Sequence, residues 1–107
     1  MTVNELIDKL SLEVLNLEEG DREIKGGYAG DLLSWVMGKA QSGDMWVTIM
    51  TNINVVAVAS LVDVACVVIA DNAEIAPEVI DKAKGQGINL LRSDRSAYSI
   101  CNEQILL

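Results

Sequence analysis

Three short polar segments follow apolar stretches of the chain, and their side chains are of types that bind ligands. Thr51-Asn52-Ile53-Asn54 follows the apolar run 45–50, Asp71-Asn72 follows 64–70, and Ser93-Asp94-Arg95 follows 88–91. The hydroxyls and amides offer neutral hydrogen bonds, and Arg95 offers one positive charge, which together suit an anionic or nucleotide-like ligand. We predict that the ligand site is formed by Thr51, Asn52, Asn54, Asp71, Asn72, Ser93 and Arg95.

The same residue types also have a purely structural interpretation. Asn, Ser and Asp are the usual N-caps of helices, where their oxygens accept hydrogen bonds from free backbone amides. Asn52, Ser93 and Asp94 are explained equally well in this way. Asn54 is harder to explain by capping, because it falls just inside the expected helix, where an amide side chain has modest helix propensity.

The chain offers little for catalysis. It contains no histidine, and its two cysteines, Cys66 and Cys101, have no C-x-x-C spacing and are expected to be small buried hydrophobes. The glycines of 26–30 match neither common phosphate-loop motif, and Gly38-Lys39 is followed by alanine rather than by a magnesium-binding hydroxyl. We therefore predict that the protein is not an enzyme and uses no cofactor or metal.

Charge and hydropathy exclude further classes. The 107 residues include 8 basic and 16 acidic side chains, a net charge of −8, which is unfavourable for binding to nucleic acid or an anionic membrane. The first residues lack the basic region and apolar stretch of a signal peptide, and no apolar run reaches the ~18 residues of a membrane span without a polar break, so we expect neither. We expect one cytoplasmic domain, spanning residues 1–107, whose core is aliphatic because the chain has no phenylalanine.

The elements that must position the polar segments can be assigned from periodicity. Thr2 and Glu5 form a capping box for an N-terminal helix, and 12–16 is predicted to be a strand that forms a hairpin-like unit with a segment around Ile24. We interpret 26–30 as a flexible loop. Asp31 is expected to cap a helix that turns the side chains of Leu32, Leu33, Val36 and Met37 towards the core.

The remainder alternates regularly between the two kinds of element. Strands are predicted at 45–50, 64–70 and 88–91, and helices at 52–61, 77–84 and 94–104. This alternation predicts an α/β fold, an open three-layer sandwich in which a mainly parallel sheet of roughly four to six strands is flanked by helices on both faces. Since the carboxyl ends of parallel strands share one edge, the three polar segments should meet there.

The helix at 52–61 is apolar on nearly all sides. One stripe holds Ile53, Val56, Ala57 and Leu61, and the opposite side holds Val55, Val58, Ala59 and Val62. A helix on the surface of a small domain buries only one face against its own sheet, so the second face requires another helix or another subunit. We predict a homodimer with an interface at Val55, Val58, Ala59 and Val62. Trp35 and Trp46 are expected in the core or an interface.

Four stretches of the sequence resemble DRTGG domains, over roughly residues 1 to 106. They are Gly30-Asp-Leu-Leu-Ser-Trp-Val-Met37, the run from Trp46 to Ala59, Val67-Val-Ile-Ala70 and the run from Ala83 to Leu91. These domains are similar to the N-terminal domain of HPr kinase/phosphorylase. The resemblance implies an α/β fold with a parallel-rich sheet and a regulatory or dimerising role.

The signature motif of that family is altered in this chain. Asn52-Ile53-Asn54 stands where the family commonly has an Asp-Arg pair, and Ala70-Asp71-Asn72 stands where it has Thr-Gly-Gly. The resemblance therefore transfers the position of a site but not its chemistry. Some stand-alone members are labelled serine kinases of HPr, a label this sequence does not support because the phosphate loop is missing.

Two functions follow from these observations. The first is a non-enzymatic regulatory or ligand-sensing domain that acts as a homodimer and binds a small polar or nucleotide ligand at the carboxyl ends of the strands. The alternative is a protein–protein interaction module without a small-molecule ligand. The resemblance implies as its partner an enzyme or a redox partner such as an iron-hydrogenase system.

Overall fold

The computed structural model describes residues 1–103, which form five helices and five strands. In chain order these are α1 (Val3–Leu10), β1 (Glu13–Asn16), β2 (Gly26–Ala29), α2 (Leu33–Lys39), β3 (Asp44–Thr48), α3 (Asn54–Val62), β4 (Cys66–Ile69), α4 (Pro77–Gln86), β5 (Leu90–Arg92) and α5 (Ala97–Asn102). The strands form one sheet in the order β1-β5-β4-β3-β2.

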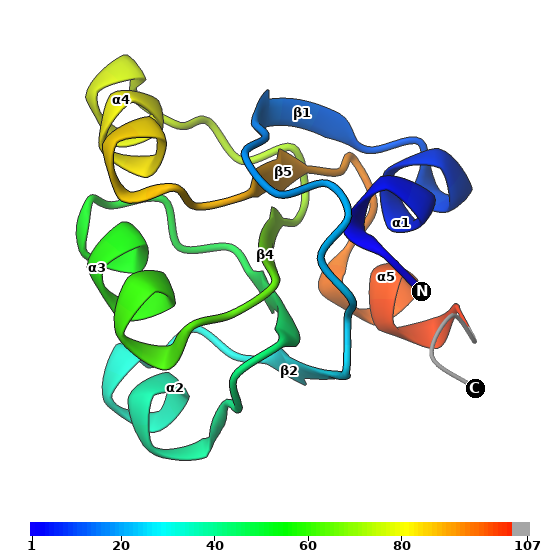
Figure 1. Cartoon of the computed structure of the whole chain (residues 1–107), viewed down its shortest axis with the longest axis horizontal. Helices are drawn as coiled ribbons and strands as arrows, with labels where there is room; N and C mark the ends of the chain where they lie inside the picture. The colour runs from blue at the N-terminus through cyan, green and yellow to red at the C-terminus, as the bar shows by residue number, and fades with distance from the viewer. Residues whose placement is uncertain (104–107) are drawn as a thin grey trace.

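Helices cover both faces of this sheet. Figure 1 shows α2, α3 and α4 on one face and α1 and α5 on the other. Each face has its own aliphatic core, one centred on α3 with Trp46 and the other on α1 with Met45 and Val47. The four strands β2, β3, β4 and β5 are parallel, and only β1 is antiparallel. The predicted α/β architecture is confirmed.

The central strands owe their place to uninterrupted apolar sequence. β3 and β4 are buried along their full length, as expected for parallel strands that are covered by helices on both sides. At the start of the chain, the Thr2 hydroxyl accepts the Glu5 amide and the Glu5 carboxylate accepts the Thr2 amide. The predicted capping box is confirmed, and it begins α1 at Val3.

The prediction of a flexible loop at 26–30 is wrong, because this segment is the parallel edge strand β2. Gly26 pairs in register with Asp44, and a side-chain Cβ at Gly26 would lie 2.8 Å from Asp44 Oδ1. The glycine is thus needed for close approach to the aspartate. Pairing with β3 overrides the poor strand propensity of glycine.

The hairpin-like unit of 12–24 is also absent. β1 pairs instead with β5 from the other end of the sequence, with Glu13 opposite Arg92. Residues near Ile24 return to the N-terminus, where the Ile24 amide donates to the Met1 carbonyl at 2.8 Å and Thr2 bridges to Glu23. Both pairings join residues far apart in sequence, which local pattern does not encode.

The predicted cap of α2 has another role. Asp31 does not cap α2, which begins without a side-chain cap. Instead, Asp31 Oδ1 accepts hydrogen bonds from Thr48 Oγ1 at 2.7 Å and from the Ile49 amide at 3.0 Å. Val36 is buried as expected and Leu33 is half-buried, but Leu32 and Met37 are exposed. The helix is therefore attached to the core along a narrower stripe than predicted.

The apolar helix α3 is covered by its own chain. It packs between α2 and α4, as Figure 1 shows. Val55, Val58 and Ala59, which were predicted to face a second subunit, are buried inside the chain, and Val62 is half-buried. The correction is that neighbouring helices bury that side, while Ile53, Ala57 and Leu61 of the other stripe are exposed.

Two further predictions divide between core and surface. Trp46 and Cys66 are fully buried, with Trp46 Nε1 donating to the Gly30 carbonyl at 2.9 Å. Trp35 is 57% exposed and Cys101 is exposed, so Cys101 is not the buried hydrophobe expected. The helix predicted at 94–104 is shorter, and residue 104 lies outside the described residues. Within residues 1–103, no helix is long and apolar enough to cross a bilayer.

Candidate functional site

The carboxyl edge of the sheet collects the predicted polar segments. β3, β4 and β5 are parallel neighbours, so their carboxyl ends lie side by side at one edge of the sheet. The segment 51–54 follows β3 and leads into α3, 71–72 follows β4, and 93–95 follows β5. The structure thus places all seven predicted site residues at this edge.

Four of the seven residues are joined directly by hydrogen bonds. The Asp71 amide donates to the Arg95 carbonyl at 2.8 Å, and the Asn72 amide donates to the Ser93 carbonyl at 2.7 Å. Ser93 is buried, and its hydroxyl accepts the Arg95 amide at 3.0 Å. Asp71 and Asn72 both have positive φ angles, 58° and 50°, a conformation that Asp and Asn tolerate better than most residues. Ser93 therefore has a structural role, as the capping interpretation predicts.

The segment after β3 forms a second, separate turn. Asn52 Oδ1 accepts the Asn54 amide at 2.9 Å, so the Asn52 side chain organises the entry to α3. Asn54 is exposed, Thr51 is half-buried, and their side chains form no hydrogen bond within residues 1–103. The Ala70 amide donates to the Thr48 carbonyl, which fixes the ends of β3 and β4 next to each other.

Asp31 holds two strand ends together and does not cap α2, the role predicted for it. Its carboxylate accepts hydrogen bonds from Thr48 Oγ1 and from the Ile49 amide. These bonds hold the end of β2 next to the end of β3. The path of the chain into 51–54 depends on this contact. An aspartate just beyond a strand can indicate such a contact between strand ends. This signal was missed because residues 26–30 were predicted to be a loop and not a strand.

A shallow hollow of about 310 Å³ opens beside the β4 and β5 turns. It is lined by Leu10, Ser11, Glu13, Asn72, Arg92, Asp94 and Arg95. Two of the predicted residues, Asn72 and Arg95, reach it. Asp94 belongs to the predicted segment 93–95. Leu10, Ser11 and Glu13, from the end of α1 to the start of β1, and Arg92 at the end of β5 were missed because the pairing of β1 with β5 was not foreseen.

Two arginines give this hollow its electrostatic character. Arg92 lies 2.8 Å from Glu13 and also donates to the Ala73 carbonyl, while Arg95 lies 2.7 Å from Glu103. The hydrogen bond with Arg92 lowers the pKa of Glu13, and the same bond raises the pKa of Arg92. The lining has two positive and two negative side chains. A neutral hollow in a chain of net charge −8 is a favourable place for an anionic group.

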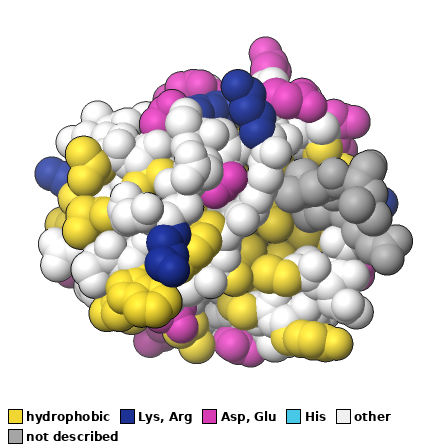
Figure 2. All heavy atoms as spheres, turned by 90° about the horizontal axis from the view of Figure 1, so that it is seen from below, with side chains coloured by type: hydrophobic (Ala, Val, Ile, Leu, Met, Phe, Trp, Pro, Cys, Tyr) yellow, Lys and Arg dark blue, Asp and Glu magenta, His cyan; other side chains and the backbone are white. Residues whose placement is uncertain are grey.

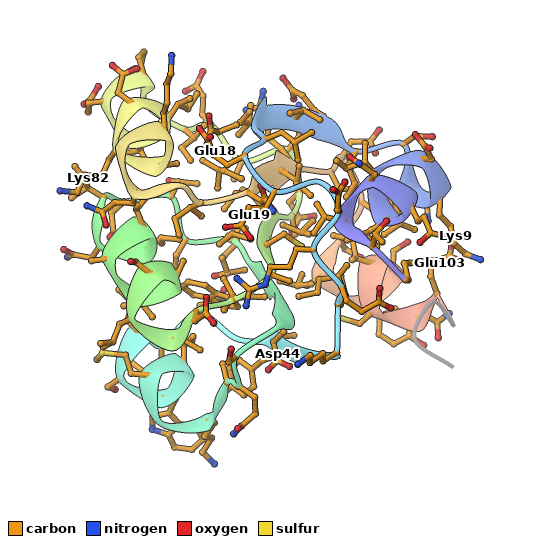
Figure 3. The ribbon with its side chains drawn as sticks, viewed as in Figure 1. Lys9, Glu18, Glu19, Asp44, Lys82 and Glu103 are labelled. Atoms are coloured by element: carbon orange, nitrogen blue, oxygen red, sulfur yellow. The ribbon has the colours of Figure 1, made fainter. Side chains whose placement is uncertain are left out.

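At the opposite, amino edge, polar side chains are used by the fold itself. Asn89 is buried; its Oδ1 accepts the amides of Glu18 and Glu19, and its Nδ2 donates to the carbonyls of Glu19 and Ala65. Figure 3 shows Glu18 and Glu19 in this region and Asp44 at the start of β3. This amide satisfies four backbone groups and has nothing left for a ligand.

An ion pair completes this edge. Arg22 Nη1 lies 2.8 Å from Asp63 Oδ1, and Ser42 Oγ donates to Asp63 Oδ2 at 2.6 Å. These hydrogen bonds, first that of Arg22 and then that of Ser42, hold the pKa of Asp63 below its ordinary value. The adjacent cleft measures only about 100 Å³. The arrangement is that of a structural network.

The described residues provide few groups for covalent or metal chemistry. Burial raises the pKa of the Cys66 thiol to about 12, which leaves it protonated at neutral pH. Burial also raises the pKa of Cys101. Residues 1–103 contain no group of three or more His, Cys, Asp or Glu side chains placed to hold a metal ion. What the carboxyl edge offers is hydrogen bonding and charge, the means of binding.

Comparisons with known proteins give information on the fold. No protein-family model matches the sequence, and no curated protein is similar to it. Among solved structures, the CBS and DRTGG domains of the regulatory region of Clostridium perfringens pyrophosphatase, crystallised with the activator diadenosine tetraphosphate, match with a TM-score of 0.74 at 15% identity. The match covers 94% of this chain and 44% of that one. The chain thus has a DRTGG-like fold, as the resemblance predicts.

Proposed function

We propose that this protein is a non-catalytic, ligand-sensing regulatory domain that acts as a homodimer and binds a phosphate-bearing, nucleotide-like ligand at the carboxyl edge of its sheet. The observation that carries the proposal is the gathering of polar side chains from three neighbouring strand ends at one edge of the sheet, where those that follow β4 and β5 line a hollow. Ligands of open α/β sheets bind at this edge, outside the carboxyl ends of the strands. A larger hollow of about 510 Å³ lies beside residues 18–22, but its lining has three acidic side chains and one basic one, which disfavours an anionic ligand.

Available side chains distinguish a binding site from a structural network. Within residues 1–103, five side chains of this edge form no hydrogen bonds with the protein: the half-buried Thr51 and the exposed Asn54, Asp71, Asn72 and Asp94. Their donors and acceptors are therefore directed to solvent or to a ligand. By contrast, Asn52 and Ser93 hold the turns in shape, which pre-organises the site.

The arginines favour an anionic group over a neutral polar one. Arg95 is about one-third exposed and is held by a single carboxylate, Glu103, that is itself exposed. A surface pair of this kind contributes little to stability, so a phosphate can replace the carboxylate at low cost and form a bidentate contact with the guanidinium. Arg92 adds a second positive charge to the same hollow.

The structural neighbour supports the choice of ligand class. The pyrophosphatase regulatory region with this fold was crystallised with a dinucleotide polyphosphate activator. Because the identity is 15%, the likeness extends to the fold, and the ligand of that protein serves here as a probe. A sensing role for this chain also requires an output, which a second copy or a partner protein would provide.

Thermal denaturation with a panel of nucleotides tests the proposal. The panel contains adenine and guanine mono- and triphosphates, their cyclic forms and diadenosine tetraphosphate, with adenosine and inorganic tripolyphosphate as part-ligands. A compound that binds only the folded state at about 100 times its Kd stabilises the protein by about 2.7 kcal/mol, a shift of several degrees. Failure of every compound to raise the melting temperature contradicts the proposal.

Variants locate the ligand. The double variant Asn52→Ala with Asn54→Ala, and the single variants Asn72→Ser and Arg95→Gln, should each reduce the shift. Gln86→Ala is the matched control, because this exposed residue lines the cleft at the amino edge. A shift that survives all three edge substitutions but is lost in the control would place the ligand elsewhere and overturn the proposed site.

A second function is favoured by one specific observation. Leu32, Trp35 and Ile49 are large hydrophobic side chains, and they are 60%, 57% and 47% exposed. They favour the alternative of an interaction module that docks on another protein and binds no small molecule. The two functions are distinguished by the nucleotide panel, since an interaction module should show no shift with any of its compounds.

A further inference from the structure

We infer that the ion pair between Arg95 and Glu103 is a latch: Glu103 competes with the anionic ligand for Arg95, and ligand binding releases the end of α5. This inference rests on the proposed function and adds its regulation. The internal carboxylate sets the affinity for the ligand, and the released end of the helix is a change that another protein chain can detect. It follows from the contacts of Arg95, the attachment of α5 and the charge of the chain.

The two arginines that line the hollow beside the β4 and β5 turns are held to different degrees. Arg92 Nε and Nη2 each lie 2.8 Å from Glu13 Oε1, and Arg92 Nη1 donates to the Ala73 carbonyl at 3.2 Å. The Arg95 guanidinium forms one hydrogen bond within residues 1–103, from Nη1 to Glu103 Oε1 at 2.7 Å. The Arg92 side chain is 20% exposed and the Arg95 side chain 37%. Arg95 is therefore the arginine that can change partners.

The backbone of Arg95 keeps this residue at the hollow whichever partner its side chain contacts. The Arg95 amide donates to Ser93 Oγ at 3.0 Å, and the Arg95 carbonyl accepts the Asp71 amide at 2.8 Å. Neither bond involves the guanidinium, so both persist when Glu103 leaves. The other N–H donors of the guanidinium have no partner within residues 1–103, and a phosphate can accept from two of them at once.

The end of α5 is attached to the sheet edge by few contacts. Ile100 is the buried residue of this helix, whereas Cys101 and Asn102 are exposed. Glu103 ends the helix in an extended conformation, and its amide donates to the Ile100 carbonyl in a long hydrogen bond of 3.4 Å. Figure 3 shows Glu103 just past the last turn. Over residues 101–103, the bond to Arg95 is the one side-chain hydrogen bond within the described chain.

The charge of the chain sets the carboxylate and a bound anion against each other. Sixteen acidic side chains accompany eight basic ones, and Figure 2 shows acidic and basic side chains gathered together along the upper rim of one face. An anion at Arg95 would lie next to the Glu103 carboxylate and repel it, while an exposed pair costs little to break. The ligand therefore displaces Glu103, and by linkage Glu103 lowers the affinity for the ligand by the same factor.

Isothermal titration calorimetry with inorganic tripolyphosphate and with diadenosine tetraphosphate tests the competition. Glu103→Gln removes the competing charge at nearly constant size, so both probes should bind about two- to fivefold more tightly, the range that an exposed ion pair contributes. Glu18→Gln is the matched control, because Glu18 is exposed at the amino edge and its side chain forms no hydrogen bond within residues 1–103. The control changes the net charge equally and should leave both affinities unchanged at about 0.15 M salt.

Backbone motion gives a readout that a purely electrostatic role of Glu103 would not change. The ¹⁵N heteronuclear NOE of the Cys101, Asn102 and Glu103 amides should fall when either probe saturates the wild type, because the end of α5 then moves more on the ps–ns timescale. Arg95→Gln breaks the same pair and should lower these values without any ligand. In Glu103→Gln the values should be low from the start and unaffected by the probes.

The outcomes distinguish the latch from the ligand site. Tighter binding to Glu103→Gln together with increased motion of residues 101–103 supports both. If the probes bind the wild type but bind Glu103→Gln no more tightly, or bind Glu18→Gln with the same gain, the ligand site stands and the latch is overturned. Unchanged NOE values in the saturated wild type overturn the latch as well. If neither probe binds the wild type or Glu103→Gln, both proposals fail.

Discussion

The two edges of the sheet carry similar polar residues, but those at the amino edge are hydrogen-bonded within the fold and several at the carboxyl edge are not. At the amino edge, Asn89 is buried and hydrogen-bonded to four backbone groups. At the carboxyl edge, Asn54 and Asn72 are exposed and their side chains form no hydrogen bond within the described residues. An amide in the sequence is therefore not informative by itself. A structural amide differs from one that is available to a ligand in whether its hydrogen-bond donors and acceptors are already paired within the fold.

The charged residues repeat this contrast. Arg22 donates to both the carboxylate and the carbonyl of Asp63, which joins the 18–23 connection to the end of α3. Arg95 meets only the carboxylate of Glu103, and both side chains are more than one-third exposed. The first arginine connects distant segments, whereas the second can exchange one carboxylate for another anion at little cost.

The largest effect should come from the buried amide at the amino edge. Asn89→Ala removes four hydrogen bonds and leaves several partly buried backbone groups unsatisfied, so we expect the free energy of unfolding to fall by about 3 kcal/mol. Urea denaturation measures this loss. Asn54→Ala is the matched substitution at the other edge and should change stability by less than about 0.5 kcal/mol. Equal losses for the two variants would remove the distinction between the edges.

An intermediate effect is expected for Asp31, a carboxyl-edge side chain that the fold itself uses. Asp31→Ala removes the hydrogen bonds to Thr48 Oγ1 and the Ile49 amide, so we expect a loss of about 1 to 2 kcal/mol. Because this contact sets the path into 51–54, nucleotide stabilisation should also decrease. Asp31→Asn retains an acceptor and should recover part of both. A variant as stable as the wild type would show that the contact is dispensable.

The smallest effect concerns the ion pair of the amino edge and depends on pH. The native pKa of Asp63 is lowered from its ordinary value of 3.8, so its ionised form stabilises the fold above about pH 4, and the benefit is lost as the pH falls through the native pKa. Asp63 is 61% exposed, and we expect Asp63→Asn to cost at most about 1 kcal/mol at pH 7.

Stability curves of wild type and Asp63→Asn between pH 2 and pH 7 should converge at the acid end. The difference should also diminish at high ionic strength, because the pair is exposed to solvent. Asparagine suits the control because Asp63 has a positive φ of 68°, which asparagine also tolerates. A constant difference across this range would mean that the ion pair contributes nothing.

Local sequence pattern was sufficient for the regular part of the fold. The buried runs of β3 and β4 and the alternation of strands with helices predicted the parallel layers, and the predicted polar segments do lie at one edge. These features depend on neighbours a few residues apart. Position was therefore predictable where a strand, its following turn and the next helix are consecutive.

Several errors involve pairings between residues that are distant in sequence. The strand Gly26–Ala29 exists because Asp44 and its neighbours pair with it, and Glu13 reaches the hollow because β1 pairs with β5. Cys101 was predicted to be buried because hydrophobicity indicates a tendency to burial but not which side of a short helix meets the sheet. Arg92 was missed because its partner, Glu13, lies 79 residues away in the sequence.

The most direct test of the account is to map the backbone amide resonances of the ¹⁵N-labelled protein during titration with the nucleotide that stabilises it most. We predict that shifts concentrate at Thr51–Asn54, Asp71–Asn72 and Ser93–Arg95, and that Glu18, Arg22, Asp63 and Asn89 are unaffected. Shifts confined to the amino-edge residues, or no shifts at millimolar nucleotide, would contradict the assignment of the carboxyl edge as the binding site.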